Sequence, residues 1–332
     1  MKAELGKIVT IVLLAAYAGD AALATPGAES QCLLEQLQTA SDEYTVGQLR
    51  RACVDEQNAE NTALAVTPDP SEGSVVGIRR AADFEARDQR FAISTYRANY
   101  FIYTYNSDPN EDPFQVDTTD FLEEGETKFQ VSFKMPVATE LFGGNTDLLF
   151  AFTSVAWWQT LNDDISNPFR ETNYEPEVFF RNYSNANLFG LNFVSWDFGL
   201  NHQSNGRSEP TSRGWDRAIG STAIELTDDL VLGLRAWYVF DYQEENNPDI
   251  KSYMGHGDIA AGWAPNRNTF TLMYRPASRG DAVQVTWSYP ISKYLRLYAQ
   301  YWNGYGESLI DYNVRTKRIG LGIALSDIIG RH

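Results

Sequence analysis

From about Phe91 onward, apolar and polar residues alternate along the chain with a period of two. In the segment 128–135, for example, Phe, Val and Met occupy every second position, and Lys, Gln and Ser stand between them. Successive side chains of a β-strand point to opposite faces, so this pattern predicts strands with one apolar face. Twelve such segments occur, at 91–106, 127–136, 148–160, 175–182, 191–204, 215–226, 230–240, 257–264, 268–275, 282–289, 294–303 and 316–325.

Alternation does not tell which face of these strands meets water. A soluble barrel is apolar inside, whereas a membrane barrel is apolar outside. An even strand count, many segments of about ten residues, and Tyr and Trp near the strand ends favour the membrane barrel. No later stretch reaches the roughly 18 to 20 apolar residues of a membrane helix, and a closed barrel is the other way to span lipid. We therefore predict an all-β fold, a twelve-stranded antiparallel transmembrane β-barrel over residues 91–332.

The connections between the predicted strands alternate in length. Short connections (227–229, 265–267, 290–293) alternate with long ones such as 107–126 and 242–256. Bacterial outer-membrane barrels have short periplasmic turns and long outer loops, so with a periplasmic N-terminus the odd-numbered loops lie outside. The net charge of −17 argues against nucleic-acid binding, and acidic outer loops attract divalent cations.

The N-terminal region predicts export. Two lysines precede a short apolar run that ends in small residues at 22–24, which favours a cleaved signal peptide over residues 1–24 rather than a retained anchor helix. We expect a periplasmic extension over 25–90, with a linker rich in Ala, Pro, Gly and charge from about residue 61. The chain contains two cysteines, Cys32 and Cys53, and in an exported protein such a pair predicts a disulfide.

The fifth predicted strand carries a candidate catalytic pair. His202 and Ser204 are two residues apart, on the face that also carries Trp196, Phe198 and Leu200. A serine hydroxyl becomes a nucleophile when an adjacent base takes its proton. His-x-Ser is a common tripeptide, however, and an incidental pair on a non-catalytic porin or transporter barrel is the alternative. No Gly-x-Ser-x-Gly motif occurs, which disfavours an α/β-hydrolase; the outward face of His202 disfavours an outer-membrane protease, which needs His and acidic residues in the mouth of the barrel.

Three longer motifs carry a resemblance to a known family. The block 202–216 (HQSNGRSEPTSRGWD) closely resembles the active-site block of outer-membrane phospholipase A, and the stretches 168–176 (PFRETNYEP) and 304–313 (GYGESLIDYN) also look like that family. The resemblance covers roughly residues 96–325 and excludes the cysteine-bearing extension. It implies a phospholipase A1/A2 of the bacterial outer membrane, a carboxylic ester hydrolase that acts on phospholipids and lysophospholipids at the outer-leaflet side.

The resemblance also implies roles for individual residues. Ser204 matches the nucleophile of the family and His202 its general base. Asp216 stands where the best-known relatives carry an asparagine that orients the histidine, and either side chain accepts the second imidazole N–H. The amide of Gly206 is expected to donate a hydrogen bond to the oxyanion.

A calcium ion beside the nucleophile is a further implication of the resemblance. Its expected ligands are the backbone carbonyl of Arg207, the side chain of Ser212 and the partner subunit's Ser166. Glu209 is a further carboxylate candidate, where relatives carry Asp. Oxygen ligands of this kind suit calcium.

The family is also activated by calcium-linked dimerisation, which implies a homodimer. The apolar faces expected to meet in such a dimer include Val131, Phe133 and Leu325. The buried glutamine contact of the family is absent, because Ser154 stands in its place.

Overall fold

The structure, a computed structural model, describes residues 73–87, 89, 92–114, 122–165 and 167–326. The predicted signal peptide, the two cysteines and Ser166 lie outside these described residues. Within them, no helix is both long and apolar enough to cross a membrane.

The described chain consists mainly of antiparallel strands. They are β1 (Ser94–Thr95), β2 (Asn99–Asn106), β3 (Gly125–Leu141), β4 (Thr146–Trp158), β5 (Phe169–Leu188), β6 (Leu191–Ser204), β7 (Gly214–Thr227), β8 (Leu230–Tyr242), β9 (Gly257–Trp263), β10 (Thr269–Pro276), β11 (Asp281–Pro290), β12 (Arg296–Tyr305) and β13 (Arg315–Ser326). The helical elements are α4 (Val75–Arg87), α5 (Ile250–Met254) and the 3-10 turns η2 (Asp112–Phe114) and η3 (Asp163–Ile165).

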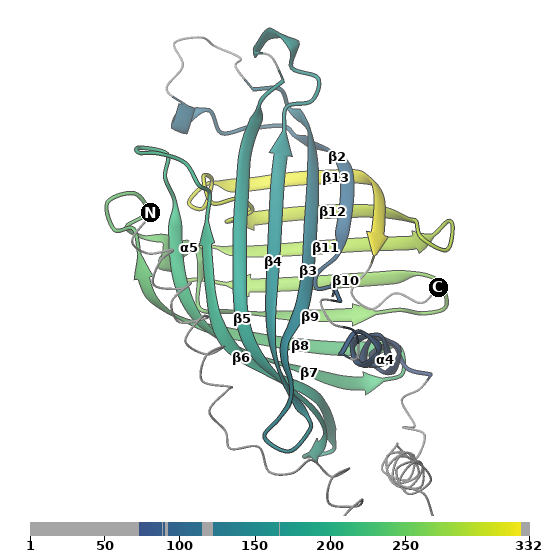
Figure 1. Cartoon of the computed structure of the whole chain (residues 1–332). Helices are drawn as coiled ribbons and strands as arrows, with labels where there is room; N and C mark the ends of the chain where they lie inside the picture. Colours follow the sequence, from purple (N-terminus) through teal and green to yellow (C-terminus); the bar gives the residue numbers. More distant parts are fainter. Residues whose placement is uncertain (1–72, 88, 90–91, 115–121, 166, 327–332) are drawn as a thin grey trace, which may run out of the picture. The chain divides into compact units, whose positions relative to one another are not determined.

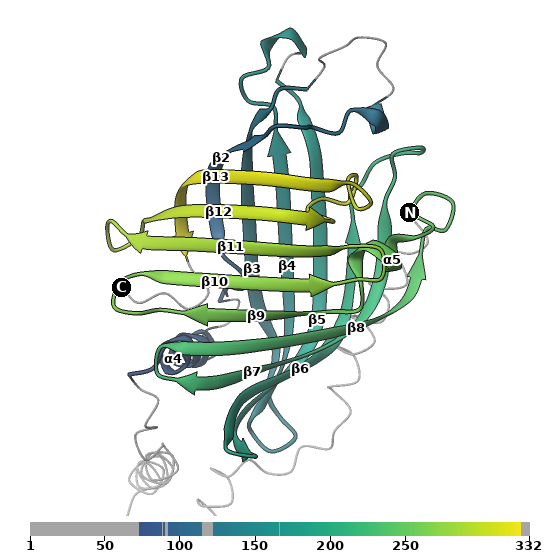
Figure 2. The same ribbon diagram turned by 180° about the vertical axis from the view of Figure 1, so that it is seen from behind.

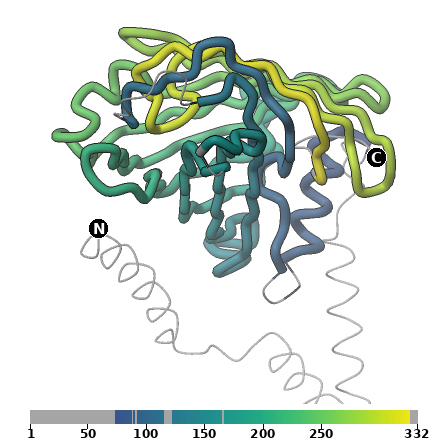
Figure 3. The backbone as a smooth tube through the Cα atoms, turned by 90° about the horizontal axis from the view of Figure 1, so that it is seen from above, coloured from purple at the N-terminus to yellow at the C-terminus, as the bar shows by residue number. Residues whose placement is uncertain are grey.

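The sheet closes on itself. Each strand from β2 to β13 pairs antiparallel with its neighbours in sequence, and β13 pairs with β2, while the two-residue β1 pairs with β3. Strands β3–β5 of one wall cross β9–β13 of the other (Figures 1 and 2), as tilted barrel strands must. Seen from above, the yellow C-terminal strand lies beside the blue β2 (Figure 3). The prediction of a twelve-stranded antiparallel barrel is therefore confirmed.

The apolar face of the strands points outward. On β6, Trp196, Phe198 and Leu200 are 40%, 65% and 47% exposed, whereas Asn201 between them and the loop is 3% exposed. The barrel interior is polar and its charges are paired, as between Lys128 Nζ and a carboxylate oxygen 2.9 Å away on the loop after β12. An apolar outside around a polar inside is the arrangement of a membrane barrel. The structure thus settles what alternation left open.

Strand β5 differs most from its predicted bounds of 175–182, since it begins at Phe169 and ends at Leu188. A β-bulge in its first residues, where Trp158 pairs with Phe169 and Trp157 with Glu171, lets two consecutive residues turn inward. Arg170 and Glu171 are accordingly 3% and 0% exposed. Two adjacent buried polar residues break the period of two, which is why the sequence pattern misses the start of this strand.

Helix α4 corrects the linker prediction for residues 75–87, because these residues form a helix packed against the barrel. Its Val75 N–H donates to the Asp228 carbonyl in the β7–β8 turn, at 2.9 Å. Its Asp83 carboxylate lies 2.6 Å from Lys134 Nζ and 3.4 Å from an Arg181 nitrogen, both on barrel strands. Burial alone would raise the pKa of Asp83, but Lys134 and the neighbouring arginines hold it below its usual value. The helix thus depends on charges far away in the sequence.

The loop lengths follow the predicted two-sided pattern. The connections at one end are 107–124, 159–168, 205–213, 243–256 and 306–314, with 277–280 as a short exception. Those at the other end are 142–145, 189–190, 228–229, 264–268 and 291–295. Helix α4 contacts the short-turn end through Asp228, whereas β6 ends at Ser204 on the long-loop end.

Candidate active site

Strands β6 and β7 bring three predicted site residues together. His202 lies directly opposite Asp216 in the β6–β7 register, and its Nδ1 is 2.7 Å from Asp216 Oδ1. On the other side of the ring, Nε2 is 3.0 Å from Ser204 Oγ. The side chains of His202 and Asp216 are 24% and 16% exposed. A hydroxyl, an imidazole and a carboxylate in this order form a chain through which a serine can be activated.

Gly206 follows two residues after Ser204, at the start of the 205–213 loop. Its φ of 66° lies in the left-handed region, which glycine adopts without steric cost. A Cβ atom at this position would lie 3.2 Å from the Tyr174 ring, so a larger residue would displace either the loop or that ring. The position is suited to a backbone amide that donates to an oxyanion beside Ser204.

The buried side chain of Asn205, 4% exposed, cross-braces the same loop. Its Oδ1 accepts from the amides of Arg213, at 2.9 Å, and Arg207, at 3.3 Å. Its Nδ2 donates to the Thr211 carbonyl at 2.9 Å. One side chain therefore joins both ends of the loop and fixes its path, a role for Asn205 that the sequence analysis did not identify.

The same loop carries the described calcium candidates. The Arg207 carbonyl accepts no hydrogen bond within the described part of the chain, and Ser212 Oγ lies 3.0 Å from Gln243 Oε1. Glu209 is exposed. No group of three or more His, Cys, Asp or Glu side chains suited to a metal occurs among the described residues. The predicted ligands in this loop are a carbonyl, a hydroxyl and a single carboxylate. Hard oxygens of this kind fit calcium, which completes its shell with water or further ligands.

A second residue that the sequence analysis left without a role lies next to this loop. Glu171 on β5 is fully buried, and its carboxylate receives a hydrogen bond from Arg207 Nε at 3.0 Å. The one sequence signal for it is its place in the motif 168–176.

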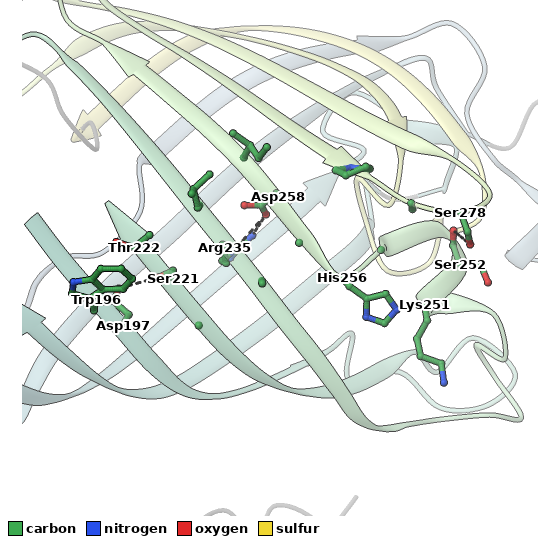
Figure 4. Close-up of a pocket in the computed structure, with 18 residues that line it drawn as sticks. Trp196, Asp197, Ser221, Thr222, Arg235, Lys251, Ser252, His256, Asp258 and Ser278 are labelled. Carbon is green, nitrogen blue, oxygen red and sulfur yellow. Dashed lines mark hydrogen bonds and ion pairs between the residues drawn. The ribbon is translucent and has the colours of Figure 1, made fainter. Parts of the chain in front are cut away.

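A separate hollow of about 880 Å³ lies along β6–β10 (Figure 4). Among its lining residues are Trp196, Ser221, Arg235, His256 and Asp258. None of the three residues of the hydrogen-bonded chain lines it, so we do not place the candidate chemistry there.

Comparisons with known proteins show the family of the chain. The family model described as Phospholipase A1 matches residues 78–325. A Phospholipase A1 of Escherichia coli (strain K12) is 37% identical over 247 residues, which cover 74% of this chain and 85% of that protein. A Phospholipase A1 of Klebsiella pneumoniae is 36% identical over 244 residues, which cover 73% and 85%.

Solved structures show the same similarity. Outer membrane phospholipase A from Escherichia coli superposes with a TM-score of 0.71 at 35% identity, over 77% of this chain and 98% of that one. The Salmonella typhi outer membrane phospholipase dimer with bound calcium also gives a TM-score of 0.71 at 35% identity, over 77% and 99%.

Proposed function

The chain belongs to the phospholipase A1 family, and we propose that Ser204, His202 and Asp216 carry out its reaction, the hydrolysis of acyl esters of phospholipids and lysophospholipids. As a member of this family with a closed β-barrel, it is a phospholipase of the bacterial outer membrane. The observation that carries the assignment of residues is the unbroken hydrogen-bonded chain from Asp216 through His202 to Ser204.

The chemistry follows from this chain. Nε2 of His202 takes the hydroxyl proton of Ser204 as Oγ of Ser204 attacks the acyl carbonyl carbon. The ester C–O bond then breaks, and His202 returns the proton to the departing alcohol, which leaves an acyl-serine. A water molecule, deprotonated by the same ring, releases the fatty acid and restores Ser204. Asp216 accepts a hydrogen bond from the Nδ1–H group throughout, which fixes the ring and stabilises it when it is charged.

The Gly206 amide and a bound calcium ion would stabilise the negative charge that develops on the carbonyl oxygen. The Gly206 amide donates a hydrogen bond to it. The Arg207 carbonyl, the Ser212 hydroxyl and the Glu209 carboxylate, with the partner subunit's Ser166, would hold a calcium ion. Such an ion supplies positive charge near the reacting ester.

The location of the three residues supports action at the outer leaflet. They lie at the long-loop end of the barrel, on the outward face of β6 and β7. Substrate would reach them from the lipid side, without entering the barrel.

A homodimer fits the apolar outer surface of β3 and β13. Val131 and Leu325 are 50% and 66% exposed, and Val131 lies opposite Ser154 on β4. The Salmonella typhi relative is a dimer with bound calcium, and we expect this chain to dimerise through the face formed by Val131, Phe133 and Leu325.

The direct test is an assay of the purified, folded chain in detergent with calcium. Release of fatty acid from phospholipid micelles is the expected result. A non-catalytic porin or transporter barrel, which the family relationship does not favour, would give conductance in liposomes without ester hydrolysis.

Asp216 allows a more specific prediction. Asp216→Asn keeps a hydrogen-bond acceptor for the ring, and we expect a loss in kcat of about tenfold or less, far below the roughly 10⁴ that the same change costs in a soluble triad. The difference arises because the family itself uses an amide here. Asp216→Ala leaves the ring without a partner and should lose considerably more. If Asp216→Asn were as inactive as Asp216→Ala, orientation of the ring would not be the role of this residue.

A further inference from the structure

Glu171 is the meeting point of three segments of the chain. It lies near the start of β5, is 0% exposed, and uses both carboxylate oxygens. Oε2 accepts from Arg207 Nε at 3.0 Å. Oε1 accepts from Asn173 Nδ2 at 2.7 Å and from the Ile310 amide at 3.2 Å.

These contacts attach two long loops to one barrel strand. Arg207 belongs to the 205–213 loop and directly follows Gly206, and its guanidinium also donates to the Arg170 carbonyl. Ile310 belongs to the 306–314 loop, whose Leu309 amide donates to Asn173 Oδ1 at 2.9 Å. The backbone between Ser204 and Arg207 is thus held from one side by Asn205 and from the other by the side chain of Arg207.

The position of Glu171 separates it from the other buried ion pairs of the barrel. Glu177 on the same strand is 6% exposed and pairs with Arg97 at 2.6 Å, but Arg97 is not part of the active-site loop. By contrast, Glu171 pairs with Arg207, whose carbonyl is a proposed calcium ligand and which directly follows Gly206, the proposed oxyanion donor. A change at Glu171 therefore reaches the backbone that faces the reacting ester.

We propose that Glu171 is a positioning residue for ester hydrolysis, which acts through Arg207 to fix the Gly206 amide and the Arg207 carbonyl relative to Ser204. This inference rests on the proposed function of Ser204. The positioning role gives a reason for the buried carboxylate at the bulge of β5. A buried charge is costly unless it is paired, and the pairing of Glu171 with Arg207 holds the 205–213 loop.

The test is Glu171→Gln. Glutamine keeps the shape of the side chain and still accepts from Asn173 and Ile310, but it cannot hold the guanidinium by charge. Loss of an oxyanion donor costs about 10² to 10³ in kcat, so we expect kcat to fall by about 10²-fold with little change in KM. The calcium concentration for half-maximal activity should rise, because the Arg207 carbonyl is displaced as well.

A double-mutant cycle identifies the contact. Arg207→Met removes the other partner and leaves the backbone carbonyl in place. Since Glu171 acts through Arg207, its replacement should have no further effect once Arg207 is removed, and E171Q/R207M should be no less active than R207M alone. The double variant buries no unpaired charge, and it carries the same test if E171Q fails to fold.

Glu177→Gln is the matched control, a buried and paired glutamate on the same strand. We expect it to lower thermal stability but to leave kcat and the calcium requirement unchanged. Wild-type kcat and calcium dependence in folded E171Q, or an equal loss in E177Q, would overturn the positioning role. Inactivity of the wild-type chain, or full activity of S204A, would instead contradict the proposed function.

Discussion

Ser204→Ala is expected to abolish phospholipid hydrolysis while the barrel remains folded. Removing the hydroxyl removes the atom that attacks the ester, and the loss of a triad nucleophile costs about 10⁶ in kcat in a well-studied serine hydrolase. His202→Ala should be comparably inactive, since no other base lies within hydrogen-bond distance of Ser204 Oγ among the described residues. Fatty-acid release from mixed micelles is the measurement.

Ser195→Ala provides the control for these variants. Ser195 lies on the same strand as Ser204 but on the opposite face, with Asp197 and Asn201, and its replacement should leave kcat unchanged. Heat-modifiable migration on a gel verifies that each variant forms the barrel. More than a few per cent of wild-type activity in Ser204→Ala would refute the serine mechanism.

The fold could be predicted from the sequence because a membrane barrel needs regular alternation over most of its strands. Alternation fails where a bulge turns Arg170 and Glu171 to the same side, and the start of β5 was missed for that reason. Helix α4 was missed for a different reason. Its Asp83 is paired with Lys134 and Arg181, and contacts between residues so distant in sequence leave no local pattern.

The candidate site could be predicted in part. The spacing of His202 and Ser204 places both on one strand face from the sequence alone. Asp216 is different, because only the strand register brings it opposite His202. The sequence predicts a role for Asp216 only through the family resemblance. Glu171 needed the structure, since its contacts with Arg207 and Ile310 join three separate segments.

Removal of calcium should have the other large effect. We expect excess chelator to reduce hydrolysis to near background without unfolding the barrel, because the proposed ligands among the described residues lie in the 205–213 loop, outside the strands. Added calcium should restore activity. Magnesium should restore little, since it demands near-ideal octahedral geometry and gives up its water reluctantly, whereas calcium accepts irregular sets of carbonyl, hydroxyl and water oxygens.

Dimer formation gives a readout of calcium that does not depend on turnover. A ligand set completed by a partner subunit predicts that calcium increases the amount of cross-linked dimer of the inactive Ser204→Ala variant as well as of the wild type.

Ser212→Ala removes one proposed ligand from the described loop, so this variant should need more calcium both for activity and for dimerisation. Ser278→Ala, in the short 277–280 connection at the same end of the barrel, is the control and should change neither. Full activity in excess chelator, or an active form that stays strictly monomeric, would contradict the calcium-linked dimer, because the Arg207 carbonyl and the Ser212 hydroxyl would then have no ion to hold.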